Sequence, residues 1–235
     1  MELKNKRIIV TGGSDGIGRH ICLKLAAVGT RLAILGRDAD RLAAVEAECV
    51  AAGASEAIGI ACDIQNPDAI SGAVEQVTAA FGGLDILINN AGIWHKTGPL
   101  DEIPPQLLQA TVQTNLTGLM QITQAAIPAL RANDEAIILN VVSKSGVVAQ
   151  AGQSVYTATK YGVRGFTEVL KADEENTGVR VGGVYQSGTN TGMFSKAGED
   201  VPNHIFTEPD DLADVVVFVL SRPPKLWIHD IRIEL

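Results

Sequence analysis

Long apolar segments, paired cysteines and an excess of basic residues are all missing from this 235-residue chain. No apolar run approaches the roughly 20 residues that a membrane-spanning helix needs. The chain carries 27 acidic residues against 19 Lys and Arg residues, which gives a net charge of -8. This balance argues against nucleic acid or an anionic membrane as a partner.

Cysteine and histidine are also sparse. Cys22, Cys49 and Cys62 form no C-x-x-C pair, and the four histidines are scattered singly, so no metal site is expected. The odd and sparse cysteine count suits a reducing compartment. Residues 1–7 lead directly into an expected strand without the apolar region of a signal peptide, and we therefore expect a cytoplasmic protein.

Short apolar runs alternate with helical patterns along the whole chain. Strands are expected at 7–10, 31–37, 57–63, 84–89, 136–142, 179–184 and 226–233. Short, uninterrupted apolar strands are typical of a sheet that is covered on both faces. The pattern predicts an α/β fold with a doubly wound, mainly parallel seven-stranded sheet and helices on both faces. With no linker or repeat, residues 1–235 are expected to form a single domain, with a substrate lid at about 186–207.

A glycine-rich turn separates the first expected strand from the first expected helix. Gly12, Gly16 and Gly18 can adopt positive φ and let the backbone approach a pyrophosphate closely. The N-terminus of the following helix offers N–H groups and a partial positive charge to that anion. This context favours a dinucleotide site over a tight turn without a ligand.

Tyr156 and Lys160 are four residues apart and share one face of an expected helix. A free phenol has a pKa of about 10, and a cation one turn away is expected to lower it. Ser143 ends the apolar run 136–142, where its hydroxyl could face the tyrosine across a substrate oxygen. Alone, the Tyr-x-x-x-Lys spacing is more often an ordinary pair on a helix surface.

Five sequence features occur together in one order: Thr11-Gly12-x-x-x-Gly16-x-Gly18, Asn89-Asn90-Ala91-Gly92, Asn115, Ser143 and Tyr156-x-x-x-Lys160. Together they resemble the short-chain dehydrogenase/reductase family, over essentially the whole chain. The resemblance implies a Rossmann-type fold, NAD(P)(H) as cofactor and hydride transfer between an alcohol and a carbonyl.

The resemblance also implies a role for each catalytic residue. Tyr156 would be the general acid in reduction and the base in oxidation, and Ser143 would polarise the substrate oxygen. Lys160 would lower the pKa of the tyrosine and bind the nicotinamide ribose. Asn115 would interrupt its helix locally and hold a water that connects Lys160 to solvent. The residues expected to bind the cofactor are Gly12, Ser14, Asp15, Gly16, Ile17, Gly18, Arg37, Asp63, Ile64, Asn89, Ala91, Gly92, Tyr156, Lys160, Gln186, Thr189 and Thr191.

The end of the second expected strand bears on the choice of cofactor. Gly36 stands where NAD enzymes usually have an acidic residue, and Arg37 follows it. A guanidinium matches a 2′-phosphate in charge and geometry. Asp15 would repel that phosphate, and Asp38 could turn toward the ribose. NADP(H) is therefore favoured, and NAD(H) is the alternative.

The chain departs from the family after the sixth strand, where Gln186-Ser187 stand in place of Pro-Gly. Trp94, Met193 and Phe194 would make the substrate pocket partly apolar. His95 and His204 could contact a polar substrate or be solvated. The family also implies a homodimer or homotetramer, formed through the helices expected at 105–130 and 154–175.

The sequence thus predicts an oxidoreductase that transfers a hydride between NADP(H) and a small-molecule carbonyl or secondary alcohol. One alternative is a protein that senses a dinucleotide without turnover, although such a protein has no need of the catalytic set. Another is epimerisation or dehalogenation on the same fold. The glycine spacing counts against the epimerase-like relatives, and the dehalogenase-like relatives lose the glycine-rich turn that is present here.

Overall fold

The computed structural model describes residues 1–234 as one sheet of seven parallel strands flanked by helices. The strand order is β3-β2-β1-β4-β5-β6-β7. Every neighbouring pair is parallel, so the carboxyl ends of all strands lie at one edge of the sheet. The doubly wound sheet is confirmed. The strands are β1 (Arg7–Thr11), β2 (Arg31–Gly36), β3 (Glu56–Ala61), β4 (Ile86–Asn89), β5 (Ala136–Val141), β6 (Val179–Gln186) and β7 (Asp230–Ile233).

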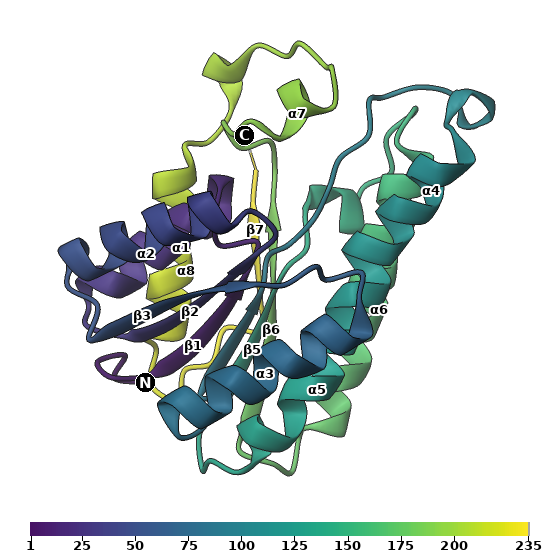
Figure 1. Ribbon diagram of the computed structural model, residues 1–235. Helices are drawn as coiled ribbons and strands as arrows, with labels where there is room; N and C mark the ends of the chain where they lie inside the picture. Colours follow the sequence, from purple (N-terminus) through teal and green to yellow (C-terminus); the bar gives the residue numbers. More distant parts are fainter. Residues whose placement is uncertain (235) are drawn as a thin grey trace.

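Helices cover both faces of this sheet (Figure 1). The first face carries α1 (Gly16–Ala27), α2 (Ala39–Ala52) and α8 (Pro209–Leu220). The second carries α3 (Pro67–Phe81), α5 (Leu119–Arg131) and α6 (Ser154–Asp173), with α4 (Pro105–Val112) beside α6.

The two layers enclose two separate hydrophobic cores. Successive strand residues point to opposite faces, so Ile8 and Val10 enter the core under α1 while Ile9 enters the core under α3 and α5. In β5, Ile137 and Ile138 divide in the same way. This two-sided burial explains why the strands are short and apolar throughout.

Capping residues set where helices begin after the carboxyl ends of the strands. Asn66 accepts hydrogen bonds from the backbone N–H groups of Asp68 and Ala69, and Pro67 occupies the first helical position of α3. The same helix ends at Gly82, which has a φ of 74°. Helix starts are thereby held at the edge of the sheet where the candidate site lies.

The single helix expected over 105–130 is interrupted in the structure. A π-helical turn, Gln113–Gly118, separates α4 from α5 and contains Asn115. The local interruption expected at Asn115 is therefore present, and α5 continues to Arg131.

The segment expected as an irregular lid contains short helices. β6 extends to Gln186, two residues beyond the expected strand, and α7 (Met193–Lys196) and a 3₁₀ turn (Asn203–Ile205) follow it. The α7 helix lies beyond the carboxyl ends of the strands (Figure 1). This segment therefore lies over the edge at which all strands end.

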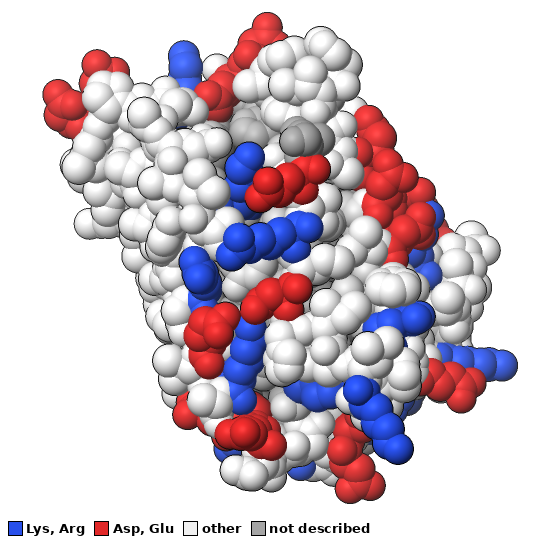
Figure 2. Space-filling model, turned by 180° about the vertical axis from the view of Figure 1, so that it is seen from behind, with Lys and Arg blue, Asp and Glu red and all other residues white. Residues whose placement is uncertain are grey.

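The outer surface mixes both signs of charge. Across the face turned away from the view of Figure 1, acidic and basic side chains alternate (Figure 2). Among residues 1–234, no helix combines the length and apolarity that crossing a bilayer requires.

Candidate active site

A cleft of about 780 Å³ follows the carboxyl ends of the strands. It spans the junction of β1 and β4, where the strand order reverses, which is the usual ligand position in such sheets. The predicted residues that line it are Gly12, Ser14, Asp15, Gly16, Ile17, Arg37, Asp63, Ile64, Ala91, Gly92, Ser143, Tyr156, Lys160, Gln186, Thr189 and Thr191. Three other predicted residues, Gly18, Asn89 and Asn115, do not contribute to this lining.

The glycine turn is built for close backbone approach. Gly12 has a φ of 63°, and a Cβ placed on it would lie 2.9 Å from the Cα of Ala91. A Cβ on Gly18 would lie 2.3 Å from the carbonyl oxygen of Gly12, so Gly18 is required for packing beneath the cleft. The turn leads directly into the N-terminus of α1, and the free N–H groups there are favourable for binding an anion.

Asp15 caps α1 and joins three elements around the cleft. Its carboxylate accepts from the backbone N–H of Gly16 at 2.7 Å and pairs with Arg41 at 3.1 Å and with Lys196 of α7. Burial acts to raise the pKa of this carboxyl, but Lys196, the Gly16 N–H and Arg41 lower the pKa overall. The negative charge that seemed to oppose a 2′-phosphate is therefore compensated by two cations.

The sequence did not indicate Arg41 as a site residue, because Arg41 reaches the site through its ion pair with Asp15 in the glycine-rich turn. It lies in α2, where its N–H donates to Asp38 Oδ1 at 3.1 Å and its Nε lies 3.3 Å from Asp38 Oδ2. Asp38 is thus engaged as the cap of α2. The spacing of Asp38 and Arg41 at a helix start was the available signal. Arg37 is exposed and lines the cleft next to them.

Asn89 lies below the cleft instead of in it. Its side chain is 1% exposed and its Nδ2 donates to Thr123 and to Asn140, both at 2.9 Å. Strand alternation turns the next residue, Asn90, toward the glycine turn, where its Nδ2 donates to the carbonyl oxygen of Thr11 at 3.0 Å. Asn90 therefore lines the cleft where direct contact had been expected from Asn89.

Asp63 and Ile64 follow β3 at the far end of the cleft. The Asp63 carboxylate accepts from the backbone N–H of Gln65 at 3.0 Å, which fixes the turn after the strand. Both residues line the cleft as expected.

Tyr156 and Lys160 lie on one side of α6 and are almost completely buried. The Lys160 Nζ lies 5.6 Å from the centre of the tyrosine ring and donates to the carbonyl oxygen of Val141 at 3.3 Å. Burial lowers the pKa of Lys160 to about 8. The pair is therefore part of the cleft wall and not an exposed helix pair.

The pKa of Tyr156 moves in the direction opposite to our expectation. Burial raises it to about 12, although the neighbouring Ser143 hydroxyl acts to lower it. The lowering expected from Lys160 does not set the net direction, because the cost of burying a phenolate is larger. The phenol consequently keeps its proton at neutral pH.

Ser143 follows β5 with an unusual backbone conformation. Its φ of 127° is rare for a residue with a side chain. Its Oγ accepts from the backbone N–H of Ser145 at 3.1 Å, which begins a 3₁₀ turn. Strain of this kind is concentrated at functional sites.

Asn115 is fully buried and holds the loop after β4. The Ile93 N–H donates to Asn115 Oδ1 at 2.7 Å, and Asn115 Nδ2 donates back to the Ile93 carbonyl oxygen at 2.9 Å. A Cβ on Gly92 would lie 3.4 Å from the same Oδ1 and 3.9 Å from Lys160 Nζ. The π-helical turn thus brings Asn115 close to Lys160 from behind the cleft.

Comparison with known proteins identifies this arrangement. A family model described as short chain dehydrogenase matches residues 6–202. The chain belongs to the short-chain dehydrogenase family. It is 32% identical to the D-beta-hydroxybutyrate dehydrogenase of Cupriavidus necator, over 95% of this chain and 93% of that protein.

Two solved structures are also similar. A metagenomic short-chain oxidoreductase in complex with NADP has a TM-score of 0.86 and 34% identity, covering 100% of both chains. A 3-ketoacyl-(acyl-carrier-protein) reductase from Brucella melitensis complexed with NADH has a TM-score of 0.87 and 28% identity, covering 98% of this chain and 96% of that one. This short-chain dehydrogenase is an NAD(P)-dependent oxidoreductase, and complexes with both nicotinamides occur among its structural neighbours.

Aromatic rings line one end of the cleft in this short-chain dehydrogenase. Trp94 lies edge-on to Tyr156 and to Phe194, with ring centres 4.5 and 5.2 Å apart, and Phe194 lies 5.3 Å from Phe206. The Trp94 Nε1–H donates to the carboxylate of Glu199. Only 4% of the chain is aromatic, so this gathering of rings at one end of the cleft is unusual for the chain.

Gln186, which lines the same cleft, carries an amide that fits a polar partner. The Oε1 atom of Gln186 is buried and has no hydrogen-bond partner within residues 1–234. A buried acceptor of this kind is costly unless a donor reaches it. Together with the glycine turn, this orphaned acceptor in the place of the usual proline fits a nicotinamide carboxamide.

Proposed function

We propose that this short-chain dehydrogenase transfers a hydride between NADP(H) and a carbonyl or secondary alcohol, with Tyr156 as general acid or base. The observation that carries the proposal is the convergence of Tyr156, Ser143 and Lys160 on one cleft. Two chain segments, the turn after β5 and helix α6, supply these side chains, and burial shifts the pKa values of Tyr156 and Lys160.

In the direction of reduction, Tyr156 would donate its proton to the carbonyl oxygen. A phenol with a pKa of about 12 holds that proton at neutral pH until charge develops on the substrate. The Ser143 hydroxyl would donate to the same oxygen. Lys160, which is protonated below its pKa of about 8, would stabilise the phenolate that remains.

The residues around the cleft have distinct expected roles toward the cofactor. When bound, the nicotinamide supplies the hydride in reduction and accepts it in oxidation. The glycine turn and the start of α1 would hold the pyrophosphate, while Asp63 and Ile64 would bind the adenine. Gln186, Thr189 and Thr191 would hold the carboxamide end, and Lys160 the nicotinamide ribose.

Asn115 would return protons to the site through water. A π-helical turn breaks the regular backbone pattern, so that a carbonyl group in it can bind a water molecule. The two bonds to Ile93 fix Asn115 within reach of Lys160. A water held there would connect Lys160 to solvent.

NADP(H) is favoured over NAD(H) by the charges at the end of β2. Arg37 has no ion pair within residues 1–234 and lines the cleft, so its guanidinium remains available to a 2′-phosphate. Arg41 and Lys196 compensate Asp15, and Asp38 is engaged at the start of α2. NAD(H) would be the cofactor if Asp38 left its cap to accept from a ribose hydroxyl.

The rings of Trp94, Phe194 and Phe206 favour a carbonyl compound with an apolar substituent. We also propose a cytoplasmic homodimer or homotetramer, in line with the three free cysteines and with Val169, which is 61% exposed on α6. A dinucleotide sensor without turnover is the remaining alternative, and the buried Tyr156–Lys160 pair argues against it.

Replacing Tyr156 with phenylalanine tests the proposal. We expect Tyr156→Phe to lower kcat by about 10³-fold or more while the NADPH dissociation constant stays nearly unchanged. Tyr161→Phe is the matched control, because Tyr161 lies on the same helix and is 41% exposed. Full activity in Tyr156→Phe, measured by NADPH oxidation with a panel of ketones, would show that the mechanism is wrong.

A further inference from the structure

The N-terminus of α6 carries the catalytic tyrosine and has no side-chain cap of its own. The residue before the helix, Gln153, makes no capping hydrogen bond through its side chain. Tyr156 is the third residue of the helix, where a backbone N–H finds no partner inside the helix. A partner from elsewhere in the chain is therefore needed.

His95 supplies that partner from the loop after β4. The backbone N–H of Tyr156 donates to His95 Nε2 at 3.3 Å. The imidazole is 1% exposed, which excludes the solvated alternative considered from the sequence. The contact spans 61 residues along the chain.

The two contacts of the imidazole define its tautomer. His95 Nδ1 lies 3.0 Å from the backbone oxygen of Lys96, which can only accept, so Nδ1 must carry the proton. The Tyr156 N–H can only donate, so Nε2 must be without a proton. One neutral tautomer satisfies both contacts, and a protonated imidazole would direct an N–H at an N–H.

The loop that carries His95 is held on both sides. Asn115 binds both backbone groups of Ile93, and the Trp94 ring lies 4.5 Å from the Tyr156 ring and 6.0 Å from the His95 ring. The interplanar angle between Trp94 and His95 is 10°, so the rings are stacked. Contacts other than its hydrogen bond with Tyr156 therefore also fix the position of His95.

We propose that His95, as its neutral Nδ1–H tautomer, is a positioning residue that holds the first turn of α6 so that the Tyr156 hydroxyl faces the substrate oxygen. The inference rests on the proposed function, since it concerns the same reaction. His95 does not touch the reacting atoms. It acts by giving a hydrogen-bond acceptor to the backbone of the residue that does.

Two substitutions of His95 test the role of its hydrogen-bond acceptor apart from the role of its ring. His95→Phe keeps a flat ring against Trp94 but removes the acceptor. His95→Gln loses the ring but can place Oε1 near the position of Nε2. His229→Phe is the control, because His229 is exposed and distant from the cleft lining.

We expect His95→Phe to lower kcat by about ten- to a hundredfold, with the ketone KM within about threefold of the original value, because the displacement affects geometry and not binding. His95→Gln should recover most of kcat, and the NADPH dissociation constant should stay the same in all three variants. An unchanged kcat in His95→Phe would overturn the proposal. A His95→Gln variant as slow as His95→Phe would also overturn it, since ring shape would then matter and not the acceptor.

Nuclear magnetic resonance provides a test that does not depend on turnover. The ¹⁵N shifts of the His95 ring should identify the Nδ1–H tautomer, and the Tyr156 amide should exchange slowly in the original chain and in His95→Gln but fast in His95→Phe. A proton on Nε2 would refute the inference. If the chain reduced no carbonyl with NADPH or NADH, the proposed function would fail, whereas these spectra would still decide whether His95 holds Tyr156.

Discussion

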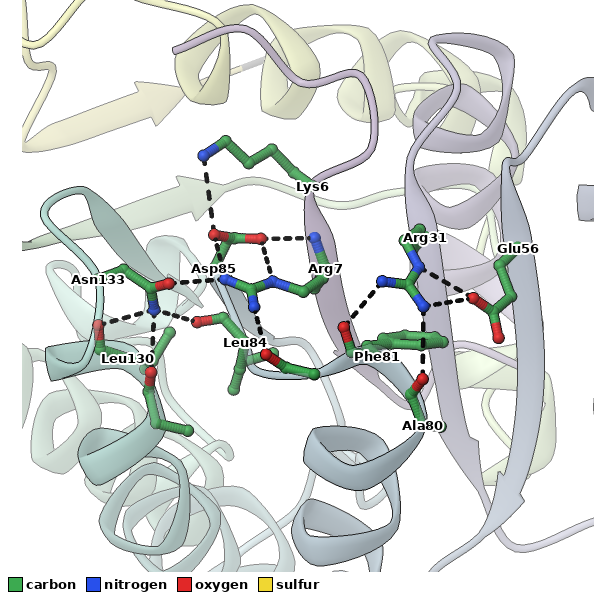
Figure 3. A network of polar contacts seen from close by, with 12 residues as sticks. Lys6, Arg7, Arg31, Glu56, Ala80, Phe81, Leu84, Asp85, Leu130 and Asn133 are labelled. Atoms are coloured by element: carbon green, nitrogen blue, oxygen red, sulfur yellow. Dashed lines mark hydrogen bonds and ion pairs between the residues drawn. The ribbon is translucent and has the colours of Figure 1, made fainter.

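At the amino ends of β1 and β2, Arg7 and Arg31 are held by protein atoms, whereas Arg37 at the carboxyl end of β2 is exposed to the cleft. Arg7 donates from Nε and Nη2 to the two oxygens of Asp85 at 2.7 and 2.8 Å, and from Nη1 to the Gly82 carbonyl oxygen (Figure 3). Its Nη2 also donates to Asn133 at 2.6 Å. Four of the five N–H donors of this guanidinium are therefore used within the protein.

Arg31 repeats this pattern on the next strand of the same edge (Figure 3). It pairs with Glu56 at 2.6 Å, donates to the Phe81 carbonyl oxygen at 2.8 Å and lies 4.7 Å above the Phe81 ring. These contacts join β2 to β3 and to the end of α3. The edge is thus closed by polar contacts and stabilises the fold.

At the carboxyl ends of the strands, several groups have shifted pKa values, an unusual backbone conformation or no hydrogen-bond partner. Tyr156 and Lys160 are buried with pKa values moved to about 12 and about 8, and Ser143 has a φ of 127°. Gln186 keeps a buried acceptor without a partner within residues 1–234. The comparison teaches that charge itself does not mark a functional edge: Arg7 and Arg31 are held by protein atoms, whereas the candidate site combines shifted pKa values, a strained backbone and an unpaired acceptor.

Among the three substitutions that test this comparison of the two edges, Lys160→Met should give the largest effect, and it should separate activity from stability. We expect kcat to fall by about 10²-fold or more, because no cation remains beside the phenolate. The pKa of Lys160 is lowered in the folded state, so the unfolded chain binds more protons between pH 8 and 10.5 and stability rises with pH across that window. At pH 7 the methionine variant should therefore be more stable, by about 1–3 kcal/mol.

Urea titrations at pH 7 and pH 10 check this prediction. The stability advantage of Lys160→Met should shrink at the higher pH, since Lys160 is then neutral in the folded original chain. A variant that is less stable at pH 7 would show that Lys160 stabilises the fold, which would remove the contrast between the two edges.

Asp85→Asn tests the edge at the amino ends of the strands and should lower the stability without changing the catalytic rate. Asp85 is 5% exposed, and the loss of its charge leaves Arg7 without its bidentate partner. We expect the free energy of unfolding to fall by about 2–3 kcal/mol at pH 7, with kcat unchanged. Denaturant unfolding and steady-state kinetics on the same preparation measure both.

The pH dependence of Asp85→Asn follows from the pKa of the carboxyl. Burial acts to raise that pKa, but the Arg7 side chain, the Arg7 N–H and Lys6 lower it overall. The stabilisation is present above the unfolded pKa of about 4 and is lost as the pH falls through the lower folded value. The difference between the two chains should therefore decrease below pH 4, and a constant difference would assign the effect to shape instead of charge.

The sequence predicted the sheet and the proximity of Ser143, Tyr156 and Lys160, because both depend on local patterns. Short apolar runs mark buried strands, and the Tyr156–Lys160 spacing places both residues on one helix face. What it could not predict depends on contacts between distant segments. Arg41 pairs with Asp15 from another turn, and His95 accepts from the Tyr156 N–H, 61 residues away.

The predicted direction of the Tyr156 pKa shift was also wrong because it depends on contacts between distant segments. The Tyr156–Lys160 spacing reveals the nearby cation, but the burial of Tyr156 involves Trp94, which lies far away in the sequence. Asn89 was expected in the cleft, and only the strand register shows that its side chain lies on the other side of the sheet. Local chemistry can be read from a motif, whereas desolvation requires the packed fold.

Arg37→Ala should have the smallest of these effects and should act on one cofactor only. Arg37 is exposed, so its removal should not change stability. We expect the NADPH dissociation constant to increase by about 10- to 30-fold, with the NADH constant within about twofold of the original value, because only NADPH carries the 2′-phosphate. Arg232→Ala, another exposed arginine, controls for net charge. Fluorescence titrations with both nucleotides measure the ratio, and an equal loss for both would mean that Arg37, like Arg7, serves the protein and not a ligand.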